Sequence, residues 1–247
     1  MQFRGFKRGV FALALSTAFA MPAAMADSIK VSVTVDNSYA LFLGTGSAAT
    51  SFIGSDFNWP TTETYEFDLP KTSFIYVVTA SDLSVAQGFL GQFVNETTGY
   101  KFYSNDIQWQ VMATGLGNSG APYTGSAADL ALLSKEIQDA NGGGNASNGW
   151  VSTTPGEANG AAPWGARPDI DAAARWVWYN KPGSGITNPT IGGYNHDEWL
   201  VFRVGVAATP QGPAPVVTPV PEPGAWALMG AGLLCVGWVG RRRSLRA

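Results

Sequence analysis

The sequence predicts a mainly β protein, an antiparallel jelly-roll-like sandwich that carries one amphipathic helix. The first observation is a hydrophobic period of two, because residues 29–35 alternate aliphatic and polar side chains. The second is the set of Gly, Asn, Ser and Pro clusters that separate short apolar segments, as the turns of a sandwich require. The third is an apolar stretch near each end, which predicts an N-terminal signal peptide and a C-terminal single transmembrane helix.

Strand-like segments recur along most of the chain. After residues 29–35, we expect strands at residues 39–43, 64–69, 74–79, 85–94, 107–113, 175–179 and 199–206. Alternation along 29–35 places the aliphatic side chains on one face of a sheet and the polar ones on the other. One face of this sheet is therefore expected to contact the core.

Residues 128–140 depart from the period of two. Leu130, Leu133 and Ile137 recur at spacings of three and four, and three consecutive glycines follow at 142–144. This spacing predicts one amphipathic helix that ends at the glycines. The next stretch, residues 141–168, is rich in Gly, Asn, Ala and Pro but carries two tryptophans, so we expect an ordered excursion from the sandwich rather than a domain boundary.

The N-terminal residues have the composition of an export signal. Three basic residues within the first eight precede an uncharged apolar core at residues 10–20. A small-x-small pattern at residues 24–26 follows, which predicts cleavage between Ala26 and Asp27. An apolar core of this length is short for a membrane span, which favours a cleaved signal over an uncleaved anchor.

The last 28 residues combine a stiff motif, an apolar stretch and a basic end. They are, in order, Val220, Pro221, Glu222 and Pro223, the uncharged residues 224–240, and Arg241, Arg242 and Arg243. Each proline fixes its own φ, so the motif is expected to be extended. As a helix, 224–240 would be about 25 Å long, slightly less than a bilayer core. The arginines should stay on the cytoplasmic side and stop transfer.

This order of motif, apolar span and basic tail resembles the PEP-CTERM sorting signal of Gram-negative bacteria. The resemblance implies recognition by an exosortase-type sorting enzyme, in strains that also make exopolysaccharide. It further implies transient anchoring in the inner membrane through the C-terminal helix, followed by release to the cell surface or the extracellular space. Residues 207–219, uncharged and rich in proline, are expected to form an extended spacer before the motif.

Charge and composition exclude several classes of function. Between Asp27 and Glu222 the chain has 18 acidic and eight basic residues, a net charge of −10, which disfavours nucleic acid as a partner. The same segment has no cysteine, so it has neither disulfides nor thiolate metal sites. His196 is the only histidine, so a multi-histidine metal centre is impossible. We expect no metal and no cofactor.

Two groups of residues are candidates for catalysis. The run His196, Asp197 and Glu198 is expected to be a solvated turn, because neighbouring residues of a strand point to opposite faces. Asp169 and Asp171 fit a carboxylate pair for glycoside hydrolysis or calcium binding on an extended segment. They equally fit a helical turn in which Asp171 pairs with Arg175. No known nucleophile or phosphate motif is present, so we expect no catalytic residues and no enzyme activity.

A second resemblance concerns the exported part of the chain. Residues 33–43, 89–93, 105–109 and 175–178 resemble strands of galactose-binding-like sandwich modules of bacterial surface proteins. Tryptophans in strand segments are expected to be core residues, because aromatic residues favour strands. Core packing explains Trp150 and Trp164 least, so these two are the candidate ligand-binding residues, with indoles that could stack on a sugar.

The sequence thus predicts four segments: a signal peptide (1–26), an exported β-sandwich domain (27–206), a proline-rich spacer (207–219) and a sorting signal (220–247). The expected function is that of an exported, non-enzymatic surface or extracellular-matrix protein, associated with exopolysaccharide or biofilm. The alternative is a carbohydrate-binding module of the same fold.

Overall fold

The computed structural model describes residues 26–118 and 123–206. The predicted signal peptide, spacer, sorting motif and transmembrane helix therefore lie outside the described residues, apart from Ala26. Within the described ranges, no helix is long and apolar enough to cross a membrane.

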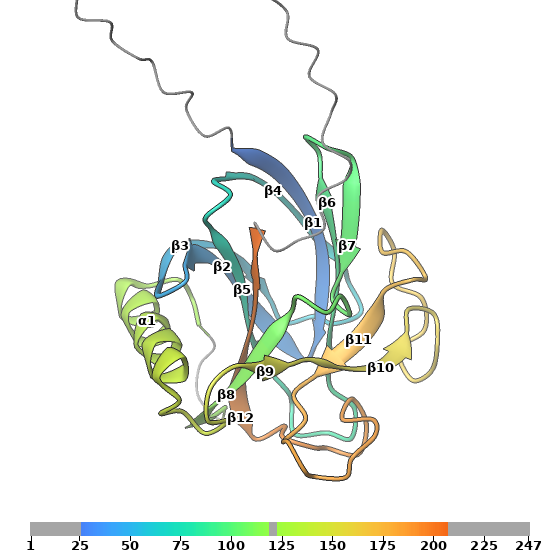
Figure 1. Ribbon diagram of the computed structural model, residues 1–247. Coiled ribbons are helices and arrows are strands. Elements are labelled where there is room, and N and C mark those ends of the chain that lie inside the picture. Colours follow the sequence, from blue (N-terminus) through green and yellow to red (C-terminus); the bar gives the residue numbers. More distant parts are fainter. Residues whose placement is uncertain (1–25, 119–122, 207–247) are drawn as a thin grey trace, which may run out of the picture.

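Two antiparallel sheets and one helix make up the described body (Figure 1). Sheet A has the order β10-β11-β6-β1-β4, with β7 also paired to β6, and sheet B has the order β3-β2-β5-β12-β8-β9. The strands of sheet A are β1 (Asp27–Asp36), β4 (Glu63–Leu69), β6 (Gly88–Asn95), β7 (Tyr100–Tyr103), β10 (Thr154–Ala158) and β11 (Arg175–Trp178). Those of sheet B are β2 (Ser38–Thr45), β3 (Ala48–Asp56), β5 (Phe74–Ala80), β8 (Gln110–Gly117), β9 (Val151–Ser152) and β12 (Glu198–Gly205).

The main core lies between the two sheets. Ile29, Val31, Val33 and Val35 of β1 are all buried in it, together with inward side chains of sheet B. Their polar neighbours lie on the opposite face of sheet A, as a period of two requires. The prediction of a mainly β fold with two antiparallel sheets is confirmed, while the finer jelly-roll-like connectivity stays a prediction.

Helix α1 (Ala127–Gly142) covers the outer face of sheet B. Leu133 and Ile137 are buried against β-strand residues that include Phe42 and Val201. The helix begins with a capping box. The Asp129 N–H donates to the Ser126 hydroxyl, and the Ser126 N–H donates to the Asp129 carboxylate. It ends at Gly143, whose φ of 74° is in the left-handed region. The predicted helix is confirmed, one residue longer at its start and two at its end.

Part of the outer face of sheet A is covered by the loop that follows β10. Trp164, Ile170 and Ala174 of this loop pack on Leu90 of β6 and Trp176 of β11. The stretch between α1 and this loop contains β9, which pairs with β8, and β10, which pairs with β11. The Gly-rich excursion therefore contributes strands to both sheets.

Two predicted strands begin too early. Val85 is 73% exposed and Ile107 is 88% exposed, and β6 and β8 begin three residues after them, at Gly88 and Gln110. The apolar residues Val85 and Ile107 made the predicted strands look longer, because apolar character is typical of a strand. Only residues that pair with a neighbouring strand belong to the sheet. The sequence also missed β3, β7, β9 and β10, because small or polar residues dominate β3 and the other three are short.

Both ends of the described body lie at one end of the sandwich. Asp27 pairs with Leu69 and Gly205 pairs with Phe74, and only the short turn at residues 70–73 separates these two partners. The Val206 N–H also donates a hydrogen bond of 2.9 Å to the carbonyl of Ser73. We call this the proximal end, because the chain continues from it toward the sorting signal.

Candidate polar binding pocket on sheet A

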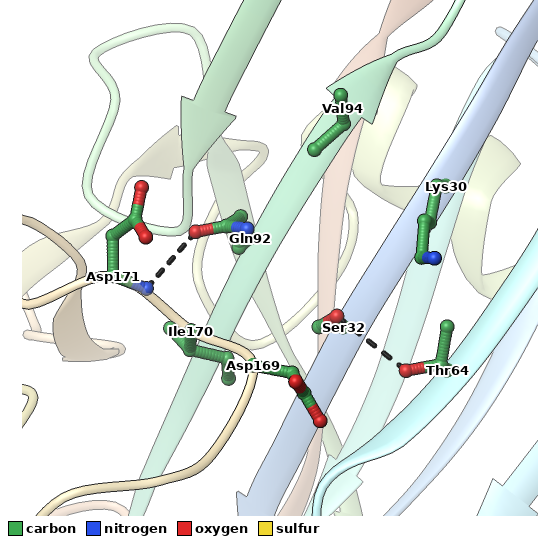
Figure 2. Close-up of a pocket in the computed structure, with 8 residues that line it drawn as sticks. All are labelled: Lys30, Ser32, Thr64, Gln92, Val94, Asp169, Ile170 and Asp171. Carbon is green, nitrogen blue, oxygen red and sulfur yellow. Dashed lines mark hydrogen bonds between the residues drawn. The ribbon is translucent and has the colours of Figure 1, made fainter.

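A polar pocket of about 470 Å³ lies on the outer face of sheet A. We call it the sheet-face pocket (Figure 2). Its lining residues come from β1, β4, β6 and the loop after β10, and they are Lys30, Ser32, Thr64, Gln92, Val94, Asp169, Ile170 and Asp171.

The floor of the pocket follows from strand register. Ser32 pairs with Gln92 of β6 on one side and with Thr64 of β4 on the other. These three polar side chains therefore form a row across the sheet, and the hydroxyls of Ser32 and Thr64 lie 3.5 Å apart. Two residues before Ser32 on β1, Lys30 forms an ion pair of 3.3 Å with Glu66 of β4.

The wall of the pocket is a turn held by buried amides. The Asp171 N–H donates to Gln92 Oε1 at 2.9 Å, which fixes the turn to the floor (Figure 2). Buried Asn159 donates to the Ile170 carbonyl at 2.6 Å and accepts from the Arg167 N–H at 2.7 Å. Asp169 has a φ of 60°, the left-handed conformation that Asp and Asn tolerate best among non-glycine residues.

The two carboxylates of the pocket have different surroundings. Asp171 Oδ2 accepts from Lys101 Nζ at 3.1 Å and from the Tyr103 hydroxyl at 3.0 Å. These two hydrogen bonds hold the pKa of Asp171 below its usual range. Asp169 has no hydrogen bond or ion pair with any residue in the described ranges, and Figure 2 shows it projecting over β1. Asp169 is therefore the carboxylate available to a ligand.

The local geometry predicted around these two residues was wrong. Asp169 lies in a turn, not in an extended segment. Asp171 does not pair with Arg175, because Arg175 begins β11 and its Nε donates to the Gly156 carbonyl at 2.9 Å. The turn nevertheless brings both carboxylates to one pocket.

Of the two candidate tryptophans, Trp164 is explained by packing. It is only 3% exposed, and its ring stacks on that of Trp176 with centroids 4.3 Å apart. Its Nε1–H donates to Asp36 Oδ2 at 2.7 Å. The expectation that core packing explains Trp164 poorly was wrong, because the sequence did not show that the loop folds back on sheet A.

Trp150 lies on the other side of the molecule. It packs at the edge of the cluster between sheet B and α1, half-buried, with the guanidinium of Arg203 3.7 Å from its ring centroid. Its Nε1–H donates to Asn141 Oδ1 at 3.0 Å. The two tryptophans therefore do not form one aromatic platform, and a ligand role for either stays a prediction.

His196 and Asp197 lie just before β12, and Glu198 is the first residue of that strand, so the predicted solvated turn does not include Glu198. His196 Nδ1 lies 2.9 Å from the Ser84 carbonyl, whereas Glu198 Oε2 accepts from the Gly115 N–H at 2.6 Å. Burial raises the pKa of Glu198. The His196 and Glu198 side chains thus have separate partners. Nothing in the described ranges gathers three or more His, Cys, Asp or Glu residues into a group that could hold a metal ion.

The sequence missed Gln92, which lines the pocket, and it missed Lys101 and Tyr103, which hold Asp171 in place. Gln92 could have been found, since it is a polar side chain within an apolar strand segment. Lys101 and Tyr103 lie on β7, which was not predicted, and about 70 residues separate them from Asp171. The pairing of β7 with β6 is what brings them within reach of Asp171.

Comparison with known proteins identifies one segment of the chain. The model of the PEP-CTERM protein-sorting motif matches residues 219–243. No curated protein and no solved structure matched the chain, so the resemblance to galactose-binding-like modules is not confirmed. The matched residues contain the predicted motif, the apolar span and the three arginines. The chain therefore carries a PEP-CTERM sorting signal, the mark of an exported protein that is transiently anchored in the membrane and processed by an exosortase.

Proposed function

We propose that this protein is a non-enzymatic surface or extracellular-matrix protein that associates with extracellular polysaccharide through the sheet-face pocket. The observation that carries the proposal is this pocket itself, a polar recess on an exported domain. The sorting signal supports the location, because it directs the chain out of the cytoplasm.

The chemistry of the pocket suits a sugar. Hydroxyls of Ser32 and Thr64, the amide of Gln92 and the carboxylate of Asp169 can all bond to sugar hydroxyls. The volume of about 470 Å³ lies in the range of small-molecule sites. These features favour sugar binding, as in the carbohydrate-binding alternative, over a role in which the domain is only displayed.

The protonation state of Asp171 supports a non-enzymatic role. Glycoside hydrolysis by two carboxyl groups requires one of them to stay protonated as the general acid. The pKa of Asp171 is held low by Lys101 and Tyr103, so this group is ionised at neutral pH. Asp171 is therefore suited to holding the turn and not to donating a proton.

Binding of the producer's own polysaccharide tests the proposal. We expect the Asp169→Asn variant of the full-length chain, purified in detergent, to bind about tenfold more weakly, because it loses a charge-assisted hydrogen bond. Asn tolerates the same backbone conformation, so the fold should be kept. The matched control is Asp68→Asn, which removes the same charge from an exposed position of the same sheet.

A second variant, Ser32→Trp, fills the pocket from its floor and should abolish binding. Isothermal titration calorimetry and co-sedimentation measure both effects. Wild-type affinity in both variants would contradict the proposal, as would equal losses in the Asp68→Asn control.

A further inference from the structure

Arg203 is a half-buried cation on the outer face of sheet B. Its guanidinium lies over the ring of Trp150 and 5.5 Å from the ring centroid of Phe74. Arg203 Nε donates to Gln110 Oε1 at 2.9 Å, and Nη1 donates to Asn141 Oδ1 at 3.0 Å. The guanidinium is thus held in one orientation by two rings and two neutral amides.

Among the described residues, no carboxylate forms an ion pair with this cation. The ion pairs of the described residues use Lys30, Lys101 and Lys135, so Arg203 has no acidic partner within those ranges. Partial burial lowers the pKa of Arg203, and the Tyr76 hydroxyl opposes this shift. A partly desolvated charge is normally paired. Its isolation in a segment with a net charge of −10 therefore indicates that the counter-charge comes from a ligand.

Strand pairing builds a pocket around the guanidinium. Arg203 pairs with Gln110 of β8, and Gln110 pairs with Ser152 of β9, so the three side chains form a row across sheet B. They line a pocket of about 380 Å³ together with Gln108, Phe74 and Ile107. We call it the Arg203 pocket.

We propose that the Arg203 pocket binds a carboxylate-bearing sugar unit of an acidic polysaccharide. The guanidinium suits a carboxylate, because its planar N–H groups match the two oxygens. Gln108 and Ser152 offer donors and acceptors to ring hydroxyls. Ile107, 88% exposed, gives an apolar surface for the C–H face of the sugar ring.

The Arg203 pocket is separate from the sheet-face pocket. The inference depends on the proposed function in one respect, which is that the ligand is part of a polysaccharide. The sheet-face pocket lies on sheet A and presents a free carboxylate, which would repel an acidic sugar. The two pockets therefore differ in the charge of the sugar they accept.

An anionic lipid headgroup is the competing ligand, because Phe74 and Gly205 place the pocket near the proximal end. The net charge of −10 on residues 27–222 repels an anionic membrane surface, so the sugar is favoured.

Binding of a defined acidic oligosaccharide tests the inference. The probe is tri-galacturonate, with the uncharged galactose trisaccharide as its matched neutral ligand, titrated into the full-length chain in detergent at low and high salt. We expect the wild type to prefer tri-galacturonate and to bind it more weakly at high salt. Arg203→Gln should reduce its affinity at least tenfold, whereas Lys71→Gln, which removes an exposed charge at the same end, should leave it unchanged.

Ser152→Glu provides a second variant in case Arg203→Gln does not fold. Its new carboxylate lies at an exposed position of the row and should occupy the guanidinium, so tri-galacturonate binding should be lost while the thermal melt is kept. Asp169→Asn should not weaken binding of tri-galacturonate, which separates this site from the sheet-face pocket.

Three outcomes would overturn the inference. The first is unchanged affinity in both Arg203→Gln and Ser152→Glu. The second is equal binding of the charged and neutral trisaccharides, or equal binding of sulfate and tri-galacturonate. The third is Arg203-dependent binding to phosphatidylglycerol vesicles, with none to phosphatidylcholine vesicles and none to tri-galacturonate.

Discussion

At the scale of single residues, the contact between Asp36 and Trp164 fixes the loop after β10 to the end of β1. Asp36 ends β1 and is 7% exposed, and its carboxylate accepts from the indole N–H of a loop residue 128 positions away. Burial raises the pKa of Asp36 to about 6, although the indole hydrogen bond opposes the rise. The hydrogen bond from Trp164 therefore offsets only part of the free energy that the ionised carboxylate loses when it is removed from water.

This raised pKa predicts a specific pH dependence of stability. The folded state keeps the proton of Asp36 up to about pH 6, whereas the unfolded state releases it near 3.8, the ordinary value. Between these values the folded state binds more protons, so the free energy of unfolding falls as pH rises. At pH 8, Asp36→Asn should stabilise residues 27–206 by up to about 3 kcal/mol, since one pKa unit corresponds to about 1.4 kcal/mol.

Urea denaturation of the wild type and Asp36→Asn at pH 4 and pH 8 measures this effect. The gain in the variant should be smaller at pH 4, and Asp68→Asn, at an exposed site, should show no comparable gain. A destabilised Asp36→Asn at pH 8 would mean that the indole hydrogen bond outweighs the desolvation.

At the scale of elements, helix α1 protects the outer face of sheet B. Leu133 is fully buried, whereas its neighbour Leu132 is 39% exposed, so adjacent leucines have opposite environments on one helix. The contact is mainly with β3 and the buried aromatic residues behind it, among them Phe42 and Tyr123. The helix is therefore part of the folded core and not an accessory on the surface.

Truncation of these two leucines tests the role of the helix. Leu133→Ala should lower the free energy of unfolding by about 2–5 kcal/mol, because it removes buried apolar contacts and leaves a cavity. Leu132→Ala should change it by about 0.5 kcal/mol or less. Chemical denaturation of both variants measures the difference, and similar losses at the two positions would show that α1 does not dock as described.

At the scale of the whole molecule, both ends of the body leave from the proximal end. The loops that carry the exposed residues Leu83, Val85 and Ile191 lie at the opposite end, since they follow the distal ends of β5 and β11. These loops are therefore opposite the end from which the chain continues toward the sorting signal.

Processing of the tail is the prediction that belongs to this scale. We expect mass spectrometry of the mature protein to find its C-terminus between Val220 and Gly224, because the extended motif precedes a short, glycine-rich apolar stretch that a sorting protease can hold and cut. Replacement of Pro221, Glu222 and Pro223 by alanine should leave the precursor in the inner membrane. Recovery of peptides that extend through Arg241 from surface-localised protein would contradict this prediction.

Features that depend on local patterns could be predicted from the amino-acid sequence alone. Alternation along residues 29–35 indicated which face of β1 is buried, because a strand has a period of two wherever it pairs. The spacing of Leu130, Leu133 and Ile137 likewise predicted the helix, because a helix places residues three and four positions apart on one face. The sorting motif was likewise readable, since its parts are contiguous in the chain.

Contacts between residues that are distant in the sequence follow instead from the three-dimensional fold. Ser32, Thr64, Gln92 and Asp169 form one pocket because β1 pairs with β4 and β6 and a turn folds over them. Within the part of the chain that the structure describes, Arg203 has no ion-pair partner, because the register of β12, β8 and β9 sets its neighbours. Trp164 becomes a core residue because its loop returns to sheet A. Hydrophobic periodicity specifies burial along each segment, whereas pairing and loop closure depend on contacts across many residues, which no local pattern contains.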